Sequence, residues 1–415
     1  MFLNHFYFPP SPFNCFILFL YLILIIKIKE DLIQKILMKN IKTIISLMSG
    51  TSVDSIDACL FKLNTQDLSF EIIDYYSLEY PKEVRKKILL LCNNKGDISD
   101  VCFMNFIIGE LFSKAVNNLL EKSNFKPEQI DFISSHGQTI YHIPKEKEIG
   151  GIKSKSTLQI GDISVISHKT KIMTIGDFRT KDIAANGQGA PLVPFFDKIY
   201  FGSKNNNNKC IQNIGGISNV TIISNQCDIF AFDNGVGNIL IDYFMKKLFN
   251  KDFDENGEIA SKGKIDEKWL NELLNEPYYN LPPPKTTGRE LFNNEYAEKI
   301  YNKAPNNKYD IITTLTAMVA KGIIDSYNKF IINKTSIAEI ILGGGGAYNK
   351  TLIKFMHNYM PNVIIKTHED YGIPNKLKEP IAFGYLGYFT LEKKFNNVPE
   401  CTGANVPVIM GKISY

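Results

Sequence analysis

Between Thr43 and Leu63 the chain reads TIISLMSGTSVDSIDACLFKL, and this stretch decides the fold. An apolar run typical of a buried strand passes through the small polar loop Ser49–Ser55 into a second, partly alternating strand. The pattern predicts a hairpin whose tip carries backbone N–H groups and hydroxyls. Such a tip suits an anionic ligand, because glycine at Gly50 lets the backbone approach the ligand closely.

The same arrangement recurs later in the chain. Cys210–Ile214 reads as a strand, Gly215 and Gly216 form the turn, and Val220–Ile223 is the return strand. Two hairpins with small-residue tips predict a duplicated architecture, although two ordinary β-turns would give the same local pattern. A third glycine-rich loop, Gly343–Asn349, follows a strand and precedes a helix. This alternation of strands and helices indicates sheets that are covered by helices.

The composition is that of a globular protein with two to three domains. The 415 residues are 44% hydrophobic and 22% charged, which excludes a largely disordered chain. The formal net charge of +4 gives no indication of nucleic-acid binding. Seven cysteines without a Cys-x-x-Cys pair predict a reducing compartment, the cytoplasm. The spacing of histidines and cysteines argues against a zinc site built by the protein.

The first 40 residues differ from the rest of the chain. Phe16–Ile26 is an uninterrupted apolar run of 11 residues, whereas a helix that spans a bilayer needs about 20. No lysine or arginine precedes the run, so a signal peptide fits poorly. A membrane anchor that ends at Lys27 and Lys29 is a second interpretation. Translation that starts at Met38 is the third, and we favour it because Met38 leads straight into the first strand.

Two further motifs bring acids and cations together. Gly176–Asp182 holds two carboxylates and two cations within seven residues, and the glycine-rich segment Gly187–Pro194 follows it. Asp233 precedes glycines at a predicted helix start, where an acid suits a general base beside a bound phosphate. The alternative role for Asp233 is that of a helix N-cap. Asp310 is expected to cap the long helix that follows it.

These motifs, in this order, resemble those of the anhydro-N-acetylmuramic acid kinase family. The motifs that carry the resemblance are Ser49–Asp57, Ser135–Thr139, Asp177–Arg179, Gly187–Pro191, Asn213–Asn219, Phe232–Gly235 and Leu342–Asn349. The resemblance extends from about Ile41 to Ile413 and leaves out only the N-terminal extension. Among the departures, Asn234 stands beside the acid where the family usually has threonine.

The resemblance implies an α/β fold, the two-lobed, ribonuclease H-like fold of the actin-like ATPases. It implies a first lobe over residues 41–175 and a second lobe over residues 176–415, whose C-terminal part packs back on the first. In that fold the nucleotide lies in the cleft between the lobes. Two hairpins hold its phosphates from either side, and a late glycine loop holds the adenosine.

The resemblance also implies a reaction. The family takes ATP and 1,6-anhydro-N-acetylmuramic acid, an amino sugar released during peptidoglycan turnover. Water opens the anhydro bridge, and the freed O6 receives the γ-phosphoryl group, which gives N-acetylmuramate 6-phosphate and ADP. This implies a phosphotransferase of cell-wall recycling that uses ATP and Mg²⁺. Two alternatives are another actin-like sugar kinase and a non-catalytic nucleotide-binding protein anchored by Phe16–Ile26. Both a monomer and a homodimer fit the sequence.

Individual residues receive roles from the resemblance. Asp233 matches the acid that activates water, and Asp182 is the second candidate for that role. Arg179 and Asp182 are expected to face the sugar. His136 and Gln138 are further candidates for sugar contacts. The expected nucleotide contacts, among which Asp54 also faces the metal ion, are Gly50, Thr51, Ser52, Val53, Asp54, Ser55, Ile56, Asp57, Gly215, Gly216, Gly343, Gly344, Gly345 and Asn349.

Overall fold

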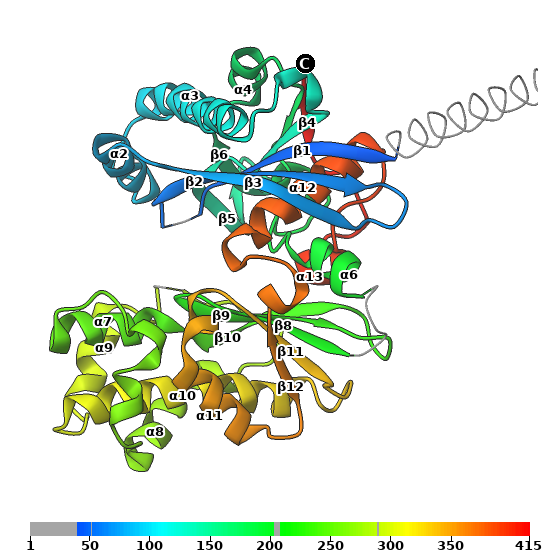
Figure 1. Ribbon diagram of the computed structural model, residues 1–415. Coiled ribbons are helices and arrows are strands. Elements are labelled where there is room, and N and C mark those ends of the chain that lie inside the picture. Colours follow the sequence, from blue (N-terminus) through cyan, green and yellow to red (C-terminus); the bar gives the residue numbers. More distant parts are fainter. Residues whose placement is uncertain (1–39, 51, 203–207, 289) are drawn as a thin grey trace, which may run out of the picture.

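The computed structural model describes residues 40–50, 52–202, 208–288 and 290–415, and Figure 1 shows them as two lobes, each built on a β-sheet. The apolar run Phe16–Ile26 lies outside the described residues, and so does the choice between an anchor and a start at Met38. Within the described residues, no helix is both long enough and apolar enough to cross a bilayer.

The first sheet has six strands in the order β13-β7-β4-β1-β2-β3. Their bounds are β1 Ile41–Met48, β2 Ser55–Asn64, β3 Phe70–Glu79, β4 Phe132–Ser135, β7 Thr174–Gly176 and β13 Lys412–Ser414. The predicted hairpin is β1–β2, an antiparallel pair that β3 extends. β4 runs parallel to β1 and β7 runs parallel to β4. The carboxyl ends of these three strands therefore open at one edge of the sheet.

The second sheet has five strands in the order β10-β9-β8-β11-β12. Their bounds are β8 Lys209–Ile214, β9 Ile217–Ile223, β10 Phe230–Val236, β11 Glu339–Gly343 and β12 Ile364–Thr367. β8, β9 and β10 form an antiparallel meander, while β11 and β12 are parallel to β8. Three antiparallel strands followed by two parallel ones repeat the order of the first sheet, so the predicted duplication is confirmed.

Helices cover both faces of the first sheet. The helices of this lobe are α2 Lys82–Cys92, α3 Ile98–Ser123, α4 Ile163–Thr170 and α12 Lys378–Leu391. Successive residues of a strand point to opposite faces. Leu60 of β2 accordingly shares a core cluster with Phe112 of α3. The next residue, Phe61, shares another with Phe383 of α12. A helix from the C-terminal part of the chain thus covers one face of the first sheet.

The second lobe gathers its helices around one buried helix, α10. They are α7 Asn238–Phe249, α8 Glu267–Leu274, α9 Asn294–Tyr301, α10 Lys308–Phe330 and α11 Lys350–Tyr359, and Figure 1 shows them on one side of the sheet. The predicted Asp310 cap is wrong. Asn307 caps α10 by accepting the Tyr309 N–H at 3.0 Å, and Asp310 accepts the Lys264 N–H at 2.7 Å from within the first turn.

Two crossings connect the lobes. α6 (Pro194–Gly202) leads into the second lobe and packs against both α12 and β9. Residues 368–378 lead back to α12. A buried ion pair of 3.0 Å between Lys378 Nζ and Asp197 Oδ1 joins the two crossings. The remaining elements are the hairpin of β5 Gln138–Ile149 and β6 Ile152–Ile160, and the short helices α5 Arg179–Ala184 and α13 Pro399–Thr402.

Candidate active site

Arg85 of α2 fixes the tip of the β1–β2 hairpin. Its Nε donates to Val53 O at 2.9 Å, and its Nη2 donates to Asp54 Oδ1 at 3.0 Å. Val53 and Ile56 bury their side chains in the core, so at these two positions only the backbone can face a phosphate. The tip is therefore held in shape by a cation that sequence reasoning missed.

The polar groups of this tip remain accessible. Ser52 and Asp54 are exposed, Gly50 and Ser55 are half-buried, and Thr51 lies outside the described residues. The described part of the chain contains no group of three His, Cys, Asp or Glu residues that could hold a metal ion. Mg²⁺ usually takes one or two carboxylates together with water and substrate phosphates. A single accessible carboxylate at a glycine tip fits that requirement.

Gln138 lies behind the tip and is fully buried. Its Oε1 accepts the Ser49 hydroxyl at 2.6 Å, and its Nε2 donates to Gly50 O at 3.4 Å. The Tyr80 hydroxyl donates to Ser49 Oγ at 3.0 Å. Protein groups thus occupy the amide that was expected to contact the sugar, and the geometry favours a role in supporting the hairpin.

The turn of the second hairpin is bound to the start of α7. Asn238 donates its N–H to Gly215 O at 2.7 Å, while Gly237 and Ile239 donate to Gly216 O at 2.9 and 3.2 Å. A Cβ added at Gly215 would meet nothing nearer than 3.6 Å, so the space above the turn is open. The positive end of the α7 dipole lies directly behind the turn and favours an anion there.

The third glycine loop is tied to the segment that returns to the first lobe. Gly344, with a φ of +77°, donates its N–H to Asn375 Oδ1 at 2.8 Å and accepts Asn375 Nδ2 at its carbonyl at 2.6 Å. A Cβ on Gly343 would lie 2.1 Å from the ring of buried His368. Gly345 is exposed at the top of the loop. Only glycine at these positions lets the loop and the crossing approach so closely.

Asn349, the last residue of this loop, serves the fold with its side chain. It is the N-cap of α11, and its Oδ1 accepts the Leu352 N–H at 2.9 Å. A Cβ on the neighbouring Gly257 would lie 2.1 Å from that oxygen, so little space surrounds it. The cap stabilises the helix start.

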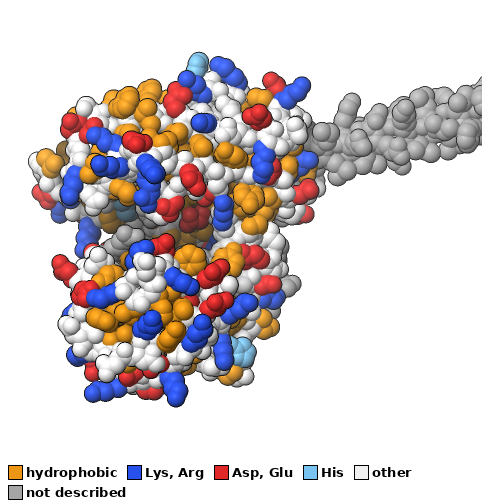
Figure 2. Space-filling view, turned by 60° about the vertical axis from the view of Figure 1, so that its left-hand side comes forward, with side chains coloured by type: hydrophobic (Ala, Val, Ile, Leu, Met, Phe, Trp, Pro, Cys, Tyr) orange, Lys and Arg blue, Asp and Glu red, His pale blue; other side chains and the backbone are white. Residues whose placement is uncertain are grey.

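Figure 2 shows the surface hollowed between the two lobes. A charged side chain of the second crossing approaches the first hairpin. Lys376 Nζ lies 3.7 Å from Asp57 Oδ1 of the first hairpin. Glu379, the second residue of α12, has an exposed side chain. The surrounding walls raise the pKa of Glu379, the cations Lys378 and Arg179 lower it, and Asp57 raises it again. The charges of Arg179 and of Asp57 in the first hairpin thus act on the same carboxyl group.

Arg179, at the start of α5, is fixed by His136. Its Nε and Nη2 lie 3.2 and 2.9 Å from His136 Nε2, and its Nη1 donates to Gly189 O at 2.8 Å. Burial, and then the charge of Arg179, lower the pKa of His136 to about 3, so the ring is neutral. His136 Nδ1 lies 2.9 Å from Gly137 O, which assigns the proton to Nδ1. His136 therefore orients the guanidinium group as a hydrogen-bond acceptor.

Asp182 is fully buried among protein donors. Its Oδ1 accepts the Thr402 hydroxyl at 2.7 Å and Asn397 Nδ2 at 2.9 Å, and its Oδ2 accepts the Gly189 N–H at 2.8 Å. A Cβ on Gly187 would lie 2.1 Å from Oδ2. This geometry favours a positioning role over the predicted catalytic and sugar-binding roles, because the carboxylate has no surface left for a ligand.

Asp233 lies in β10 and is half-buried. Its Oδ2 accepts the Thr287 N–H at 2.9 Å. Burial raises the pKa of Asp233 to about 6, although the hydrogen bond from Thr287 lowers it. The charge of Glu290 also raises this pKa, and the charge of Lys285 lowers it. The alternative role as a helix cap is wrong, because α7 has Gly237 at its N-cap position and no side-chain cap.

The surroundings of Asp233 tie it to the second hairpin. Asp233 is paired with Asn219 of β9, close behind the glycine turn. The neighbouring Asn234, one of the departures from the family pattern, is fully buried. Its Oδ1 accepts Gln212 Nε2 at 2.9 Å, and its Nδ2 donates to Ser326 Oγ at 2.7 Å. Asparagine is therefore accommodated here with both ends of its amide bonded.

Sequence reasoning missed the segment that covers Asp233. The Tyr278 hydroxyl donates to Asp233 O at 2.9 Å, and the Asp233 N–H donates to Lys285 O at 3.1 Å. The signal that could have found this segment was the run PPPKTTG at residues 282–288, where three prolines stiffen a loop that carries one lysine. Nothing local to that run points to a partner that precedes it by 54 positions in the chain.

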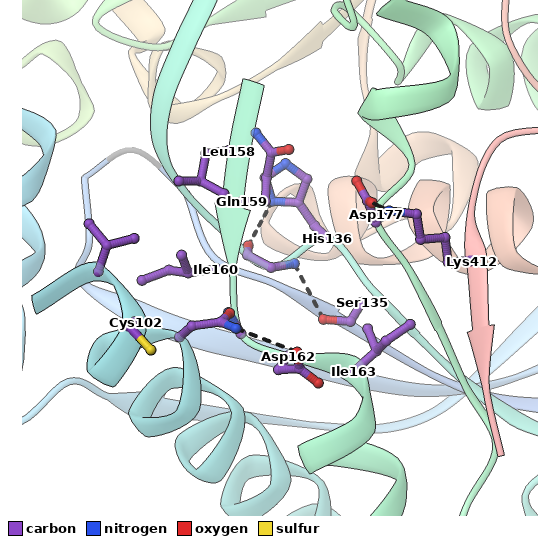
Figure 3. Close-up of a pocket in the computed structure, with 14 residues that line it drawn as sticks. Cys102, Ser135, His136, Leu158, Gln159, Ile160, Asp162, Ile163, Asp177 and Lys412 are labelled. Carbon is purple, nitrogen blue, oxygen red and sulfur yellow. Dashed lines mark hydrogen bonds and ion pairs between the residues drawn. The ribbon is translucent and has the colours of Figure 1, made fainter. Parts of the chain in front are cut away.

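A cavity of about 320 Å³ opens beside His136 in the first lobe. Figure 3 shows Asp177 and Lys412, which form an ion pair, at one end of the cavity and Cys102 at the other. Its lining residues come from the first lobe and the C-terminal strand. The two charged residues of the Asp177–Arg179 motif thus have different surroundings. Asp177 faces this cavity, while Arg179 contacts His136.

Comparisons with known proteins agree with one another. The family model for anhydro-N-acetylmuramic acid kinase matches residues 42–415. A relative of that name from Caldanaerobacter subterraneus subsp. tengcongensis is 43% identical over an alignment of 395 residues that covers 92% of this chain and 100% of the relative. One from Clostridioides difficile is 43% identical, over 89% of this chain and 97% of its own length. One from Francisella tularensis subsp. novicida is 42% identical, over 91% and 100%.

Among solved structures, component A of (R)-2-hydroxyglutaryl-CoA dehydratase from Acidaminococcus fermentans has a TM-score of 0.43 at 12% identity, over 83% of this chain and 96% of that chain. The family model covers both hairpins, Arg179, Asp233 and the third glycine loop in one match that starts in β1. The chain therefore belongs to the anhydro-N-acetylmuramic acid kinase family.

Proposed function

We propose that the protein is a kinase that uses ATP and water to convert 1,6-anhydro-N-acetylmuramic acid into N-acetylmuramate 6-phosphate and ADP in the recycling of peptidoglycan. The setting of Asp233 carries this proposal. Burial raises the pKa of this carboxyl group to about 6, and the group lies close behind the open glycine turn of the second hairpin. A general base works best when its pKa is near the working pH.

Asp233 takes the proton of the water molecule that attacks the anomeric carbon. The hydroxide part of that water forms the new bond to C1 while the bond between C1 and O6 breaks. O6 then accepts the γ-phosphoryl group, and ADP leaves. Among the described residues, one donor contacts the Asp233 carboxylate: the Thr287 N–H, which is bonded to Oδ2. Oδ1 is therefore left to receive the proton. A positioned base contributes about 10²–10⁴-fold to such a step.

The glycine loops would hold the nucleotide. The tip at Gly50–Asp54 and the turn at Gly215 and Gly216 would lie against the phosphates. The Gly215 N–H is bonded to Ile217 O, so Gly216 would donate its N–H, and the start of α7 would add its dipole. The loop at Gly343–Gly345 contacts the adenosine. Asp54 would hold Mg²⁺, which would supply positive charge to the phosphates.

Arg179 would pair with the lactyl carboxylate of the sugar. Burial lowers the pKa of Arg179 to about 10, opposed by Glu379 and Asp182, so the guanidinium group stays charged at neutral pH. A guanidinium fork matches a carboxylate in shape and charge. His136 and Asp182 act behind it: one orients the guanidinium group, and the other fixes the loop whose Gly189 carbonyl accepts from it.

We place this reaction in the cytoplasm, where ATP is available. The six cysteines in the described part of the chain are all free, as expected in a reducing compartment.

Mass spectrometry of the product formed in ¹⁸O-labelled water tests the proposed reaction. Purified protein with ATP and the anhydro sugar should give a sugar phosphate that carries one ¹⁸O atom on C1 and none on the phosphoryl group. Quenching within seconds limits exchange at the anomeric hydroxyl. An unlabelled sugar phosphate, or labelled inorganic phosphate without a sugar phosphate, would contradict the proposal.

A further inference from the structure

The segment 277–288 holds Asp233 from one side through three hydrogen bonds. It begins with the 3₁₀ turn Pro277–Asn280. The Tyr278 hydroxyl donates to Asp233 O at 2.9 Å, the Asp233 N–H donates to Lys285 O at 3.1 Å, and the Thr287 N–H donates to Asp233 Oδ2 at 2.9 Å. Both the backbone and the carboxylate of Asp233 are therefore fixed by one short stretch of chain.

Lys285 lies inside this segment as a buried cation with 6% of its surface exposed. Its Nζ lies 4.7 Å from the ring centroid of Tyr278, 4.9 Å from that of Phe330 and 5.9 Å from that of Phe232. It donates to Tyr278 O at 3.3 Å. Three aromatic rings attract the ammonium ion and restrict its movement.

The charges that act on the pair come from Glu290, two residues beyond the segment, and from Lys329 on α10. Lys285 lowers the pKa of Asp233 and Glu290 raises it, while burial is the largest cause of its rise to about 6. Burial, and then the charge of Lys329 on α10, lower the pKa of Lys285 to about 8, and Asp233 opposes them. Burial raises the pKa of Tyr278, so its hydroxyl stays protonated. Between about pH 6 and 8 the carboxylate and the ammonium are both charged.

A buried ammonium ion surrounded by rings would be unfavourable without a compensating negative charge. Asp233 provides that charge, since it is the carboxylate that acts on Lys285. In turn, an opposite charge close to a carboxyl group favours its ionised form.

We propose that Lys285 is a positioning residue for Asp233: its carbonyl accepts the Asp233 N–H, the nearby Thr287 N–H orients the carboxylate, and its caged ammonium ion keeps that carboxylate ionised. This inference rests on the proposed role of Asp233 as the base. It makes segment 277–288 part of the site, because this segment would set the pH below which kcat/KM falls.

The test compares the pH profiles of kcat/KM for four proteins between pH 5 and 9. They are the wild type, Lys285→Met, Lys285→Arg and, as a matched control, Lys334→Met. Lys334 also lies over an aromatic ring, 4.4 Å from the centroid of Phe230, but it is exposed and does not act on Asp233. Nucleotide affinity and thermal melting are measured alongside for each protein.

The wild type should lose activity below about pH 6. In Lys285→Met this acidic limb should move upward by about one pH unit, which is about a fivefold loss at pH 6 that approaches about tenfold at pH 5 and shrinks toward pH 8. Lys285→Arg should keep the limb near its wild-type position, and Lys334→Met should match the wild type throughout. Nucleotide affinity should not change.

An unchanged acidic limb in Lys285→Met, or an equal loss at every pH, would overturn the inference and make Lys285 structural. If Lys285→Met does not fold, the acidic limb of the pH profile of kcat/KM is measured for Lys285→Gln instead. A wild type that forms no sugar phosphate at any pH refutes the proposed function instead, so the two failures are distinguishable.

Discussion

The surroundings of Asp182 and of Asp233 differ in what they leave free. Asp182 accepts three hydrogen bonds, which occupy both oxygens, and has no exposed surface. Asp233 accepts one such bond to its carboxylate and keeps a raised pKa in a half-buried position. Both acids belong to glycine-containing motifs, so composition alone makes them equivalent. From this difference we expect that the number of donors around each carboxylate, more than its motif, decides whether it positions other groups or acts as a base.

Asp233→Asn should have the largest effect. The substitution keeps the shape and removes the base, so formation of sugar phosphate should fall by about 10²–10⁴-fold. Both ligands should still bind, because the glycine loops and Arg179 are unchanged. Rapid-quench turnover and calorimetric titration of ATP and of the sugar measure this. Near-wild-type turnover would remove the distinction between the two acids.

Asp182→Asn should act mainly on stability. An amide in place of the carboxylate puts N–H donors against the donors of Gly189, Thr402 and Asn397, and an unsatisfied buried group costs about 1–3 kcal/mol. The Gly189 carbonyl that holds Arg179 should also shift, so KM for the sugar should rise more than kcat falls. Urea unfolding and steady-state kinetics measure the two effects.

Asp325→Asn is the matched control for Asp182→Asn. Asp325 pairs with Lys321 at 3.0 Å on the surface, and such pairs contribute about 0–1 kcal/mol. If Asp182→Asn were as mild as this control, Asp182 would not have the positioning role. If it abolished turnover with unchanged stability, Asp182 would be a catalytic residue.

The smallest expected effect is on the pH dependence of unfolding. The folded-state pKa of Asp233 is raised from 3.8 to about 6, so the folded protein binds this proton more tightly than the unfolded chain does. The contribution of Asp233 to stability is therefore fully present below about pH 4 and is lost as the pH rises through 6.

Allowing for partial exposure of Asp233, this contribution amounts to about 1–2 kcal/mol. Asp233→Asn should accordingly raise the free energy of unfolding, relative to the wild type, by about that amount more at pH 8 than at pH 4.5. Urea unfolding at the two pH values measures it. An equal difference at both would mean that the pKa of Asp233 is not raised in the folded state.

The parts of the fold that depend on residues close together in the sequence could be predicted. Apolar runs on both sides of Gly50 and of Gly215 predicted both hairpins, and the sheet orders confirmed the duplication. The cap of α10 was placed wrongly at Asp310 because Asn307 and Asp310 are both good N-caps, and only the packing of Lys264 against Asp310 separates them.

Site residues could be predicted only where neighbouring residues in the same loop indicate their role. The glycine tips and Asp233 could be singled out from their neighbours in sequence. The contacts made by Lys285, Thr287 and Arg85 could not, because each reaches a partner more than 30 positions away, and no periodicity records such pairings. For the same reason the burial of Asp182 under Thr402 was invisible in the sequence.

The return of α12 and β13 to the first sheet affects how the chain folds as it is synthesised. One face of β1, β2 and β4 stays uncovered until residues 378–414 emerge from the ribosome, because α12 and β13 complete that lobe. Strands β8 to β12, by contrast, come from one continuous stretch that ends before residue 368. We therefore expect the second lobe to complete its fold before the first, and Phe61 and Phe132 of the nascent first lobe to stay exposed until α12 covers them.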